Sequence, residues 1–199
     1  MTPQTLSHVV VAVATRSGVN PLTAQCIDQL LGAGATVASV ANCSDVALAR
    51  NLLLTRVLRL VPPERTTILM VDDDMSFERK TAEAIVEAAE DGPTSACYLT
   101  SAGALAHHRR GPRNWLTGLG FLAVKRTDLQ ALADKLEPVT GLNGEKLLPF
   151  CQCGPRDGQW WSEDYWLTDA LGGVRLARVA VGHIKQHVMM PEMVPDIWE

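Results

Sequence analysis

The chain has 199 residues, 47% of them hydrophobic, which predicts one compact domain over residues 1–187 and a C-terminal tail over 188–199. A formal net charge of -4 excludes a global attraction to nucleic acid or to an anionic membrane, although the basic stretch at 107–113 leaves a local contact with nucleic acid open. We find no transmembrane segment and no signal-peptide pattern, so we expect a cytoplasmic protein, in the host cytoplasm if the chain is viral.

The five cysteines are scattered and odd in number, which argues against a secreted disulfide framework. Cys26, Cys43 and Cys97 fall in apolar segments and are expected in the core. Cys151 and Cys153 lack the second Cys/His pair of a structural zinc site. We therefore predict no catalytic thiol.

Apolar strands and amphipathic helices alternate along the first 75 residues. Strands are predicted at 9–14, 36–41 and 66–71, one helix from the Asn20 cap to Gly32, and a second helix from a Ser44 cap to Pro62. The inward stripe of the first helix is predicted to hold Leu22, Cys26, Ile27, Leu30 and Leu31. This β-α-β-α-β order predicts a parallel sheet, whose ligands gather at the carboxyl ends of its strands.

The rest of the chain predicts further strands and helices of an α/β fold. Helices are expected at 78–90, at 128–136 and after a Ser162 cap, with strands at 96–100, 115–124 and 174–181 and a polar loop between the first two of these strands. Gly118 and Gly120 interrupt the strand at 115–124, which indicates either a close approach of a ligand or another backbone, or a β-bulge. The irregular stretch at 137–161 indicates a functional loop or lid.

An apolar strand ends in three carboxylates, those of Asp72, Asp73 and Asp74. Because close like charges repel, this run predicts a bound cation such as Mg²⁺ or Mn²⁺. The alternative is a turn in which one Asp caps the following helix. The sequence has neither a P-loop nor a Gly-x-Gly-x-x-Gly motif, so a bound nucleoside diphosphate would need a metal.

This combination resembles the metal-dependent GT-A glycosyltransferases of the family-2-like type. Asp72-Asp73-Asp74 matches their Asp-x-Asp motif, and four further segments occur in the expected order, covering about residues 9 to 187. These segments are Ala49-Arg50-Asn51-Leu52-Leu53, Gly118-Leu119-Gly120-Phe121, Ser162-Glu163-Asp164-Tyr165 and Gly182-His183.

The resemblance implies a GT-A fold, a Rossmann-like α/β domain with a mixed, mostly parallel sheet flanked by helices. It implies transfer of a sugar from a nucleotide-sugar, which we expect to be a UDP-sugar, to an acceptor hydroxyl. A divalent metal, Mn²⁺ or Mg²⁺, is the implied cofactor. The implied metal ligands are Asp72, Asp74 and His183, with His187 as a weaker candidate. The implied donor-binding residues are Thr15, Arg16, Arg50, Asp72 and Asp73. Arg50 is expected to pair with a phosphate or with Asp72, or alternatively to form a helix-surface salt bridge.

The resemblance also implies catalytic roles for Asp164, as an inverting general base, and for Glu163. A carboxylate in the first turn of a helix is stabilised as an anion, which lowers its basicity. The alternative is therefore that Glu163 and Asp164 only stabilise the start of the helix and have no catalytic role.

The acceptor is expected to contact Gly118, Gly120 and Trp161. Trp115, Trp160 and Trp166 are further candidates for stacking, or ordinary core residues. A glycan, a lipid, a protein and a modified nucleic-acid base all remain open as acceptors, as does the oligomeric state.

Two other classes of function stay open at this point. Carboxylates and a metal also serve a nucleotidyltransferase or a phosphohydrolase. The same fold without turnover would be a nucleotide-binding module.

Overall fold

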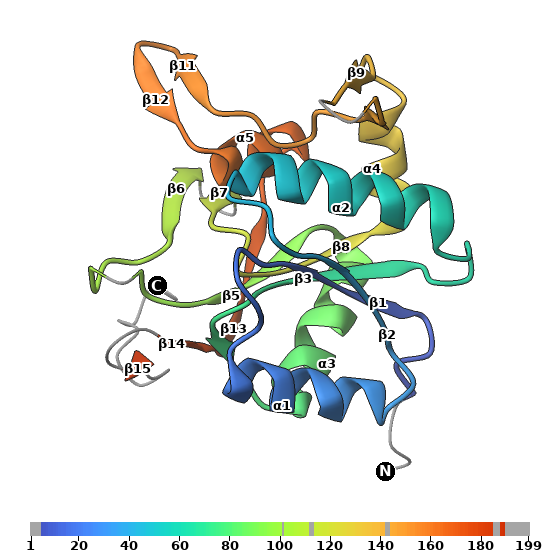
Figure 1. The fold of residues 1–199 in the computed structure, drawn as a ribbon. Helices are drawn as coiled ribbons and strands as arrows, with labels where there is room; N and C mark the ends of the chain where they lie inside the picture. Colours follow the sequence, from blue (N-terminus) through green and yellow to red (C-terminus); the bar gives the residue numbers. More distant parts are fainter. Residues whose placement is uncertain (1–4, 101, 112–113, 142–143, 185–187, 190–199) are drawn as a thin grey trace.

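The computed structural model describes residues 5–100, 102–111, 114–141, 144–184 and 188–189. Six strands form the central sheet, in the spatial order β13-β5-β8-β3-β1-β2 (Figure 1). β8 runs antiparallel to β3 and β5, and the other neighbours are parallel. The predicted α/β class with a mixed, mostly parallel sheet is therefore confirmed. The strand bounds are β1 (Val9–Ala14), β2 (Thr36–Val40), β3 (Thr67–Asp72), β5 (Thr94–Cys97), β8 (Phe121–Lys125) and β13 (Arg175–Ala180).

Helices cover both faces of the sheet. α1 (Pro21–Leu31) and α3 (Arg79–Ala88) lie on one face, and α2 (Val46–Leu60), α4 (Arg126–Ala133) and α5 (Glu163–Ala170) lie on the other (Figure 1). A short 3-10 helix, η1 (Ala89–Asp91), extends α3. Successive residues of β1 point to opposite faces and join two separate hydrophobic clusters, which explains why the whole strand is apolar.

The starts of the first two helices test the predicted caps. The Asn20 side chain accepts a hydrogen bond from the Leu22 amide at 3.0 Å, as predicted for α1. The cap of α2 is Asp45 and not Ser44, because the Asp45 carboxylate accepts from the Leu48 amide at 2.9 Å. Leu22 and Leu31 are exposed, so the buried stripe of α1 is narrower than predicted.

The predicted strand at 115–124 is two strands. β7 (Asn114–Thr117) pairs with β6 (His107–Gly111), where a polar loop was predicted, and β8 belongs to the central sheet. The hydroxyl of Tyr98 fills the space beside Gly118 and Gly120, and a Cβ at Gly118 would collide with it. These glycines therefore mark the close approach of a side chain, where a ligand or another backbone was predicted.

The stretch at 137–161 also contains regular structure that was not predicted. β9 (Val139–Thr140) pairs with β10 (Lys146–Leu147), and β11 (Gly154–Arg156) pairs with β12 (Gln159–Trp161). The β11–β12 hairpin projects from the body of the molecule (Figure 1). Two- and three-residue strands carry too little periodicity to be recognised in a sequence.

A small three-stranded sheet contains the end of the described chain. It has the order β15-β14-β4, formed by β4 (Met75–Ser76), β14 (Gly182–Ile184) and β15 (Val188–Met189). β15 lies in the predicted tail; His187 and residues 190–199 fall outside the described residues. The end of the domain at 187 stays a prediction.

The five cysteines are free thiols. Cys97 is buried as expected, whereas Cys26 and Cys43 are half-buried at the edges of the two clusters. Within the described part of the chain, no helix is long and apolar enough to cross a membrane.

Candidate functional site

The carboxyl ends of β1 and β3 open into a cleft of about 530 Å³. All of the residues predicted to bind donor or metal or to act in catalysis line it, except His187, which lies outside the described residues. They come from segments far apart in the sequence, and the parallel sheet brings them to one edge. These residues are Thr15, Arg16, Arg50, Asp72, Asp73, Asp74, Glu163, Asp164 and His183.

The three aspartates of the run face three different partners. Asp72 Oδ1 accepts a hydrogen bond from Arg50 at 2.7 Å, and Asp73 Oδ2 accepts from the Thr15 hydroxyl at 2.5 Å. Asp74 Oδ1 lies 3.1 Å from His183 Nε2. A bound cation was predicted because the three carboxylates would repel one another. Their separate partners reduce this repulsion. The alternative helix cap is wrong, because Glu78 is the N-cap residue of α3.

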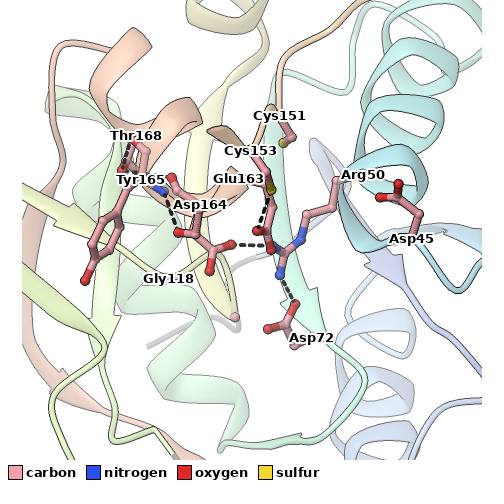
Figure 2. A network of polar contacts seen from close by, with 12 residues as sticks. Asp45, Arg50, Asp72, Gly118, Cys151, Cys153, Glu163, Asp164, Tyr165 and Thr168 are labelled. Atoms are coloured by element: carbon pink, nitrogen blue, oxygen red, sulfur yellow. Dashed lines mark hydrogen bonds and ion pairs between the residues drawn. The ribbon is translucent and has the colours of Figure 1, made fainter. Parts of the chain in front are cut away.

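Arg50 is the centre of an ionic cluster that joins α2, β3 and α5 (Figure 2). The residue is only 4% exposed, and its guanidinium contacts Asp72 at 2.7 Å, Glu163 at 2.8 Å and Asp164. Although burial lowers the pKa of Arg50, the three carboxylates raise it well above its ordinary value. Arg50 is therefore an interior cation, and the alternative of a helix-surface ion pair is wrong.

Asp164 has the environment of a base that titrates near neutrality. Its side chain is 25% exposed, and this partial burial raises the pKa of Asp164 to about 6. Arg50 lowers this pKa, whereas Glu163 and Asp72 raise it. The sequence predicted a weaker base from the helix start alone, but loss of water outweighs that effect here. The Ser162 cap of α5 is confirmed, with its hydroxyl 3.5 Å from the Tyr165 amide.

The contact between Asp74 and His183 constrains the imidazole. His183 Nδ1 lies 3.0 Å from the carbonyl oxygen of Leu99, which can only accept, so Nδ1 carries the hydrogen. A neutral ring then presents the lone pair of Nε2 to the Asp74 carboxylate. Two acceptor atoms that lie 3.1 Å apart repel each other, so either a second proton on the His183 ring or a nearby cation would stabilise this contact.

The cleft is strongly acidic. Five carboxylates and two guanidiniums line it, which gives a formal charge of -3 with His183 neutral. Arg16 lies at the rim, where its guanidinium donates to the Ser44 carbonyl oxygen at 3.4 Å. Among the described residues, no group of three or more His, Cys, Asp or Glu side chains is arranged to hold a metal by itself.

The predicted acceptor residues divide into two places: Gly120 adjoins the cleft, since a Cβ on it would lie 3.1 Å from Asp72 Oδ2, whereas Trp161 lines another cavity. Gly118 and Gly120 form the backbone between β7 and β8, where the Asp72 amide donates to the Gly120 carbonyl oxygen at 3.0 Å. Trp161 is only 9% exposed and lines a second cavity together with the exposed Trp160.

Two further residues contribute to the site without having been given a role. Tyr98 accepts a hydrogen bond from the Gly120 amide at 2.9 Å and so supports the backbone beside Asp72. Asn51 bonds both backbone groups of Cys151, at 2.7 and 2.8 Å, and ties the segment before α5 to α2. The Arg-Asn segment indicated Asn51, whereas no sequence signal indicated Tyr98.

The fold and the site together define an α/β protein with an acidic cleft at the edge of a mixed sheet. No protein-family model matches the chain, and no curated protein matches it in sequence. A197 from STIV is similar to it in structure, with a TM-score of 0.59, 14% sequence identity, and coverage of 92% of this chain and 93% of A197.

A nucleoside-diphosphate-sugar pyrophosphorylase from Vibrio cholerae RC9 gives a TM-score of 0.39 at 10% identity, over 97% of this chain and 83% of that protein. This value is too low to support an argument. The similarity to A197 shows a shared fold, and the GT-A resemblance stays a prediction.

Proposed function

We propose that this chain is a metal-dependent glycosyltransferase that moves a sugar from a nucleotide-sugar to an acceptor hydroxyl. The observation that supports this most is the single cleft in which five separate segments of the predicted motif set meet, namely 15–16, 50, 72–74, 163–164 and 183. A nucleotide at the carboxyl edge of a parallel sheet is the common arrangement in such folds.

The charge of the cleft favours a metal-bound donor. A diphosphate alone would be repelled by five carboxylates, so a divalent cation would have to accompany it. Asp74 and His183 would hold this ion, since Nε2 of His183 lies 3.1 Å from Oδ1 of Asp74 and both atoms can be metal ligands. Mg²⁺ typically takes few protein ligands and completes its coordination with phosphate, which fits a two-residue site. When bound, the ion would stabilise the charge that develops on the leaving phosphate.

The remaining residues receive roles from their positions. Thr15 and Arg16 follow β1 at the rim, where they would contact the base or ribose of a UDP-sugar. Asp164 would accept the proton of the acceptor hydroxyl while the hydroxyl oxygen bonds to the anomeric carbon from the face opposite the nucleotide. The bond from that carbon to the nucleoside diphosphate would break, which would invert the anomeric centre. Glu163 shares the guanidinium of Arg50 with Asp164, so these contacts would hold the base in place.

Isothermal titration tests the donor site. UDP, GDP and UDP-glucose are titrated with and without Mn²⁺ into wild type, into Asp74→Ala, and into Asp91→Ala as a control for an exposed carboxylate outside the cleft. We expect binding that requires Mn²⁺, is lost in Asp74→Ala and is kept in Asp91→Ala. Absence of nucleotide binding in the presence of Mn²⁺ would contradict the proposal.

Product analysis then separates the open enzyme classes. A glycosyltransferase releases a nucleoside diphosphate and leaves the sugar on another molecule. A nucleotidyltransferase releases pyrophosphate, and a phosphohydrolase releases phosphate. Binding without any product in the presence of candidate acceptors, unchanged by Asp164→Asn, would identify a binding module.

A further inference from the structure

A second cavity of about 240 Å³ lies beside the cleft. Residues of β6, β7 and β12 and of the first turn of α5 line it, and the two hairpins that contain these strands flank the start of α5 (Figure 1). Trp161 and Tyr165 face this cavity, whereas Glu163 and Asp164 face the cleft. The start of α5 is therefore a wall shared by both.

The lining of the second cavity is aromatic and rich in hydrogen-bond donors. Trp160, Trp161 and Tyr165 supply rings, and His108 and Arg110 supply N–H groups. None of the described lining residues is a carboxylate. This chemistry is the opposite of that in the cleft, where five carboxylates face the ligand.

The described lining of the second cavity contains one guanidinium, that of Arg110, and no carboxylate. Arg110 and Arg156 both pair with Asp169, and Arg156 Nε also lies 3.9 Å from Asp157 Oδ2, so these arginines are balanced by carboxylates that lie outside the lining. The guanidinium of Arg156 lies 4.5 Å from the ring centroid of Trp161, and that of Arg110 lies 5.6 Å from it. These cations fix and cover Trp161.

Trp160 is the tryptophan that offers its ring to a ligand. It is 74% exposed at the edge of the cavity, whereas Trp161 is buried beneath the guanidiniums. An exposed large aromatic side chain beside a ring-sized cavity favours stacking of a planar group.

We propose that this second cavity binds a nucleotide unit of a single-stranded nucleic acid. Its base would stack on Trp160, and its phosphates would lie near Arg110 and His108. Aromatic platforms combined with a cationic surface are the general way in which proteins hold single strands. A neutral sugar fits less well, because its hydroxyls are bound best by carboxylate acceptors and none of the lining residues that the structure describes is a carboxylate.

The binding site stands independently of the cleft; only its role as the acceptor site rests on the proposed glycosyltransferase function. Because both cavities share the first turn of α5, a nucleic acid held in the second cavity lies next to Asp164. The acceptor would then be a hydroxyl carried by a nucleic-acid base.

Fluorescence anisotropy of a labelled twelve-residue oligothymidylate tests the site in EDTA, without metal or donor. Two variants are compared with wild type, Trp160→Ala and Arg110→Gln. Leu60→Ala is the control for an exposed apolar side chain, at 76% exposure. Arg175→Gln is the control for an Asp-paired arginine, since its side chain is 46% exposed against 44% for Arg110.

We expect Trp160→Ala to weaken binding by about tenfold or more and both controls to bind as wild type does. Arg110→Gln should weaken binding and reduce the slope of log K against log salt by about 0.7, the value for one phosphate on a single strand. Binding that is unchanged in Trp160→Ala would overturn the proposal.

Competitors identify the source of the ligand. We expect unlabelled oligothymidylate to compete more strongly than thymidine monophosphate, which carries one base and one phosphate. Equal competition by inorganic polyphosphate would show a charge effect without stacking, and Trp160-dependent binding of a neutral oligosaccharide would show a sugar site; either result overturns the proposal. Oligonucleotide binding in a protein that fails to bind any nucleotide-sugar would overturn the proposed function alone.

Discussion

The cleft at the sheet edge and the cavity between the hairpins share the start of α5, yet their side chains differ in sign. The cleft has five carboxylates against two guanidiniums, whereas the described lining of the second cavity has no carboxylate. One helix start thus divides a region suited to a metal-bound donor from a region suited to an anionic strand.

The two regions also differ in how they are supported. The cleft lies on the six-stranded sheet, between two buried clusters. The second cavity rests on two-stranded hairpins, which are marginal by themselves and depend on contacts with α5. The comparison predicts that changes in the cleft act on chemistry and on the stability of the whole domain, whereas changes in the hairpins act on ligand choice.

The largest effect is expected from Asp164→Asn. The side-chain amide of asparagine cannot accept the proton of the acceptor hydroxyl, so the rate of sugar transfer should fall by about 10²–10⁴-fold. Oligonucleotide binding at the second cavity should stay unchanged, which would show that the cleft and the second cavity act independently. Single-turnover rates and anisotropy measure the two effects, and a variant that keeps its transfer rate would exclude Asp164 as the base.

The pH dependence of the wild-type rate sharpens this assignment. Asp164 acts only when ionised, and partial burial raises its pKa to about 6. The transfer rate should therefore increase with pH through about 6 and level off above about 7. A profile without this acidic limb would indicate a different base.

Arg50→Met should destabilise the fold by roughly 3 kcal/mol at pH 8, because it leaves three carboxylates without their shared cation. The pKa of Asp164 is already raised in the folded state, and losing Arg50 raises it further. A raised carboxyl pKa costs stability once the group is ionised, so the loss should shrink as pH falls from 8 to 5.

Urea unfolding at both pH values measures this effect. Arg56→Met is the matched control on the same helix, since Arg56 is 43% exposed and pairs with Glu145 alone among the described contacts. The control should lose less than about 1 kcal/mol. Equal losses in both variants would show that the Arg50 cluster behaves like a surface ion pair.

Gly118→Ala acts at the junction between the hairpin β6–β7 and the central sheet. The new Cβ would collide with the Tyr98 hydroxyl, so we expect a loss of about 1–3 kcal/mol. Gly154→Ala, where the Cβ would meet open space, should have a smaller effect. In the double variant Gly118→Ala/Tyr98→Phe, removal of the hydroxyl should restore part of the lost stability. If the losses of the two single variants simply add in the double variant, the collision is contradicted.

Asp45→Ala should have the smallest effect, about 1 kcal/mol of unfolding free energy, through loss of the cap of α2 at the rim of the cleft. Ser44→Ala is the matched control and should have little effect on stability. Thermal unfolding of both variants would show which residue caps the helix, and a larger loss in Ser44→Ala would reverse the assignment.

Local pattern determined much of the framework. The apolar runs at β1 and β3, the Asn20 and Ser162 caps and the stop before Pro62 are all confirmed, since each depends on residues within a turn or two. Parallel pairing then follows from chain order, and it predicts that Asp72–Asp74 and the end of β1 share an edge.

Tertiary structure decided where each charge points. The sequence presents three adjacent aspartates, but contacts over long separations give them different partners: Arg50 on α2, Thr15 after β1 and His183 on β14. The need for glycine at 118 likewise comes from Tyr98, twenty residues earlier, whose hydroxyl occupies the space that a Cβ would need. Periodicity reports which face of an element is apolar, whereas the partner of a polar group depends on packing between elements that no local pattern contains.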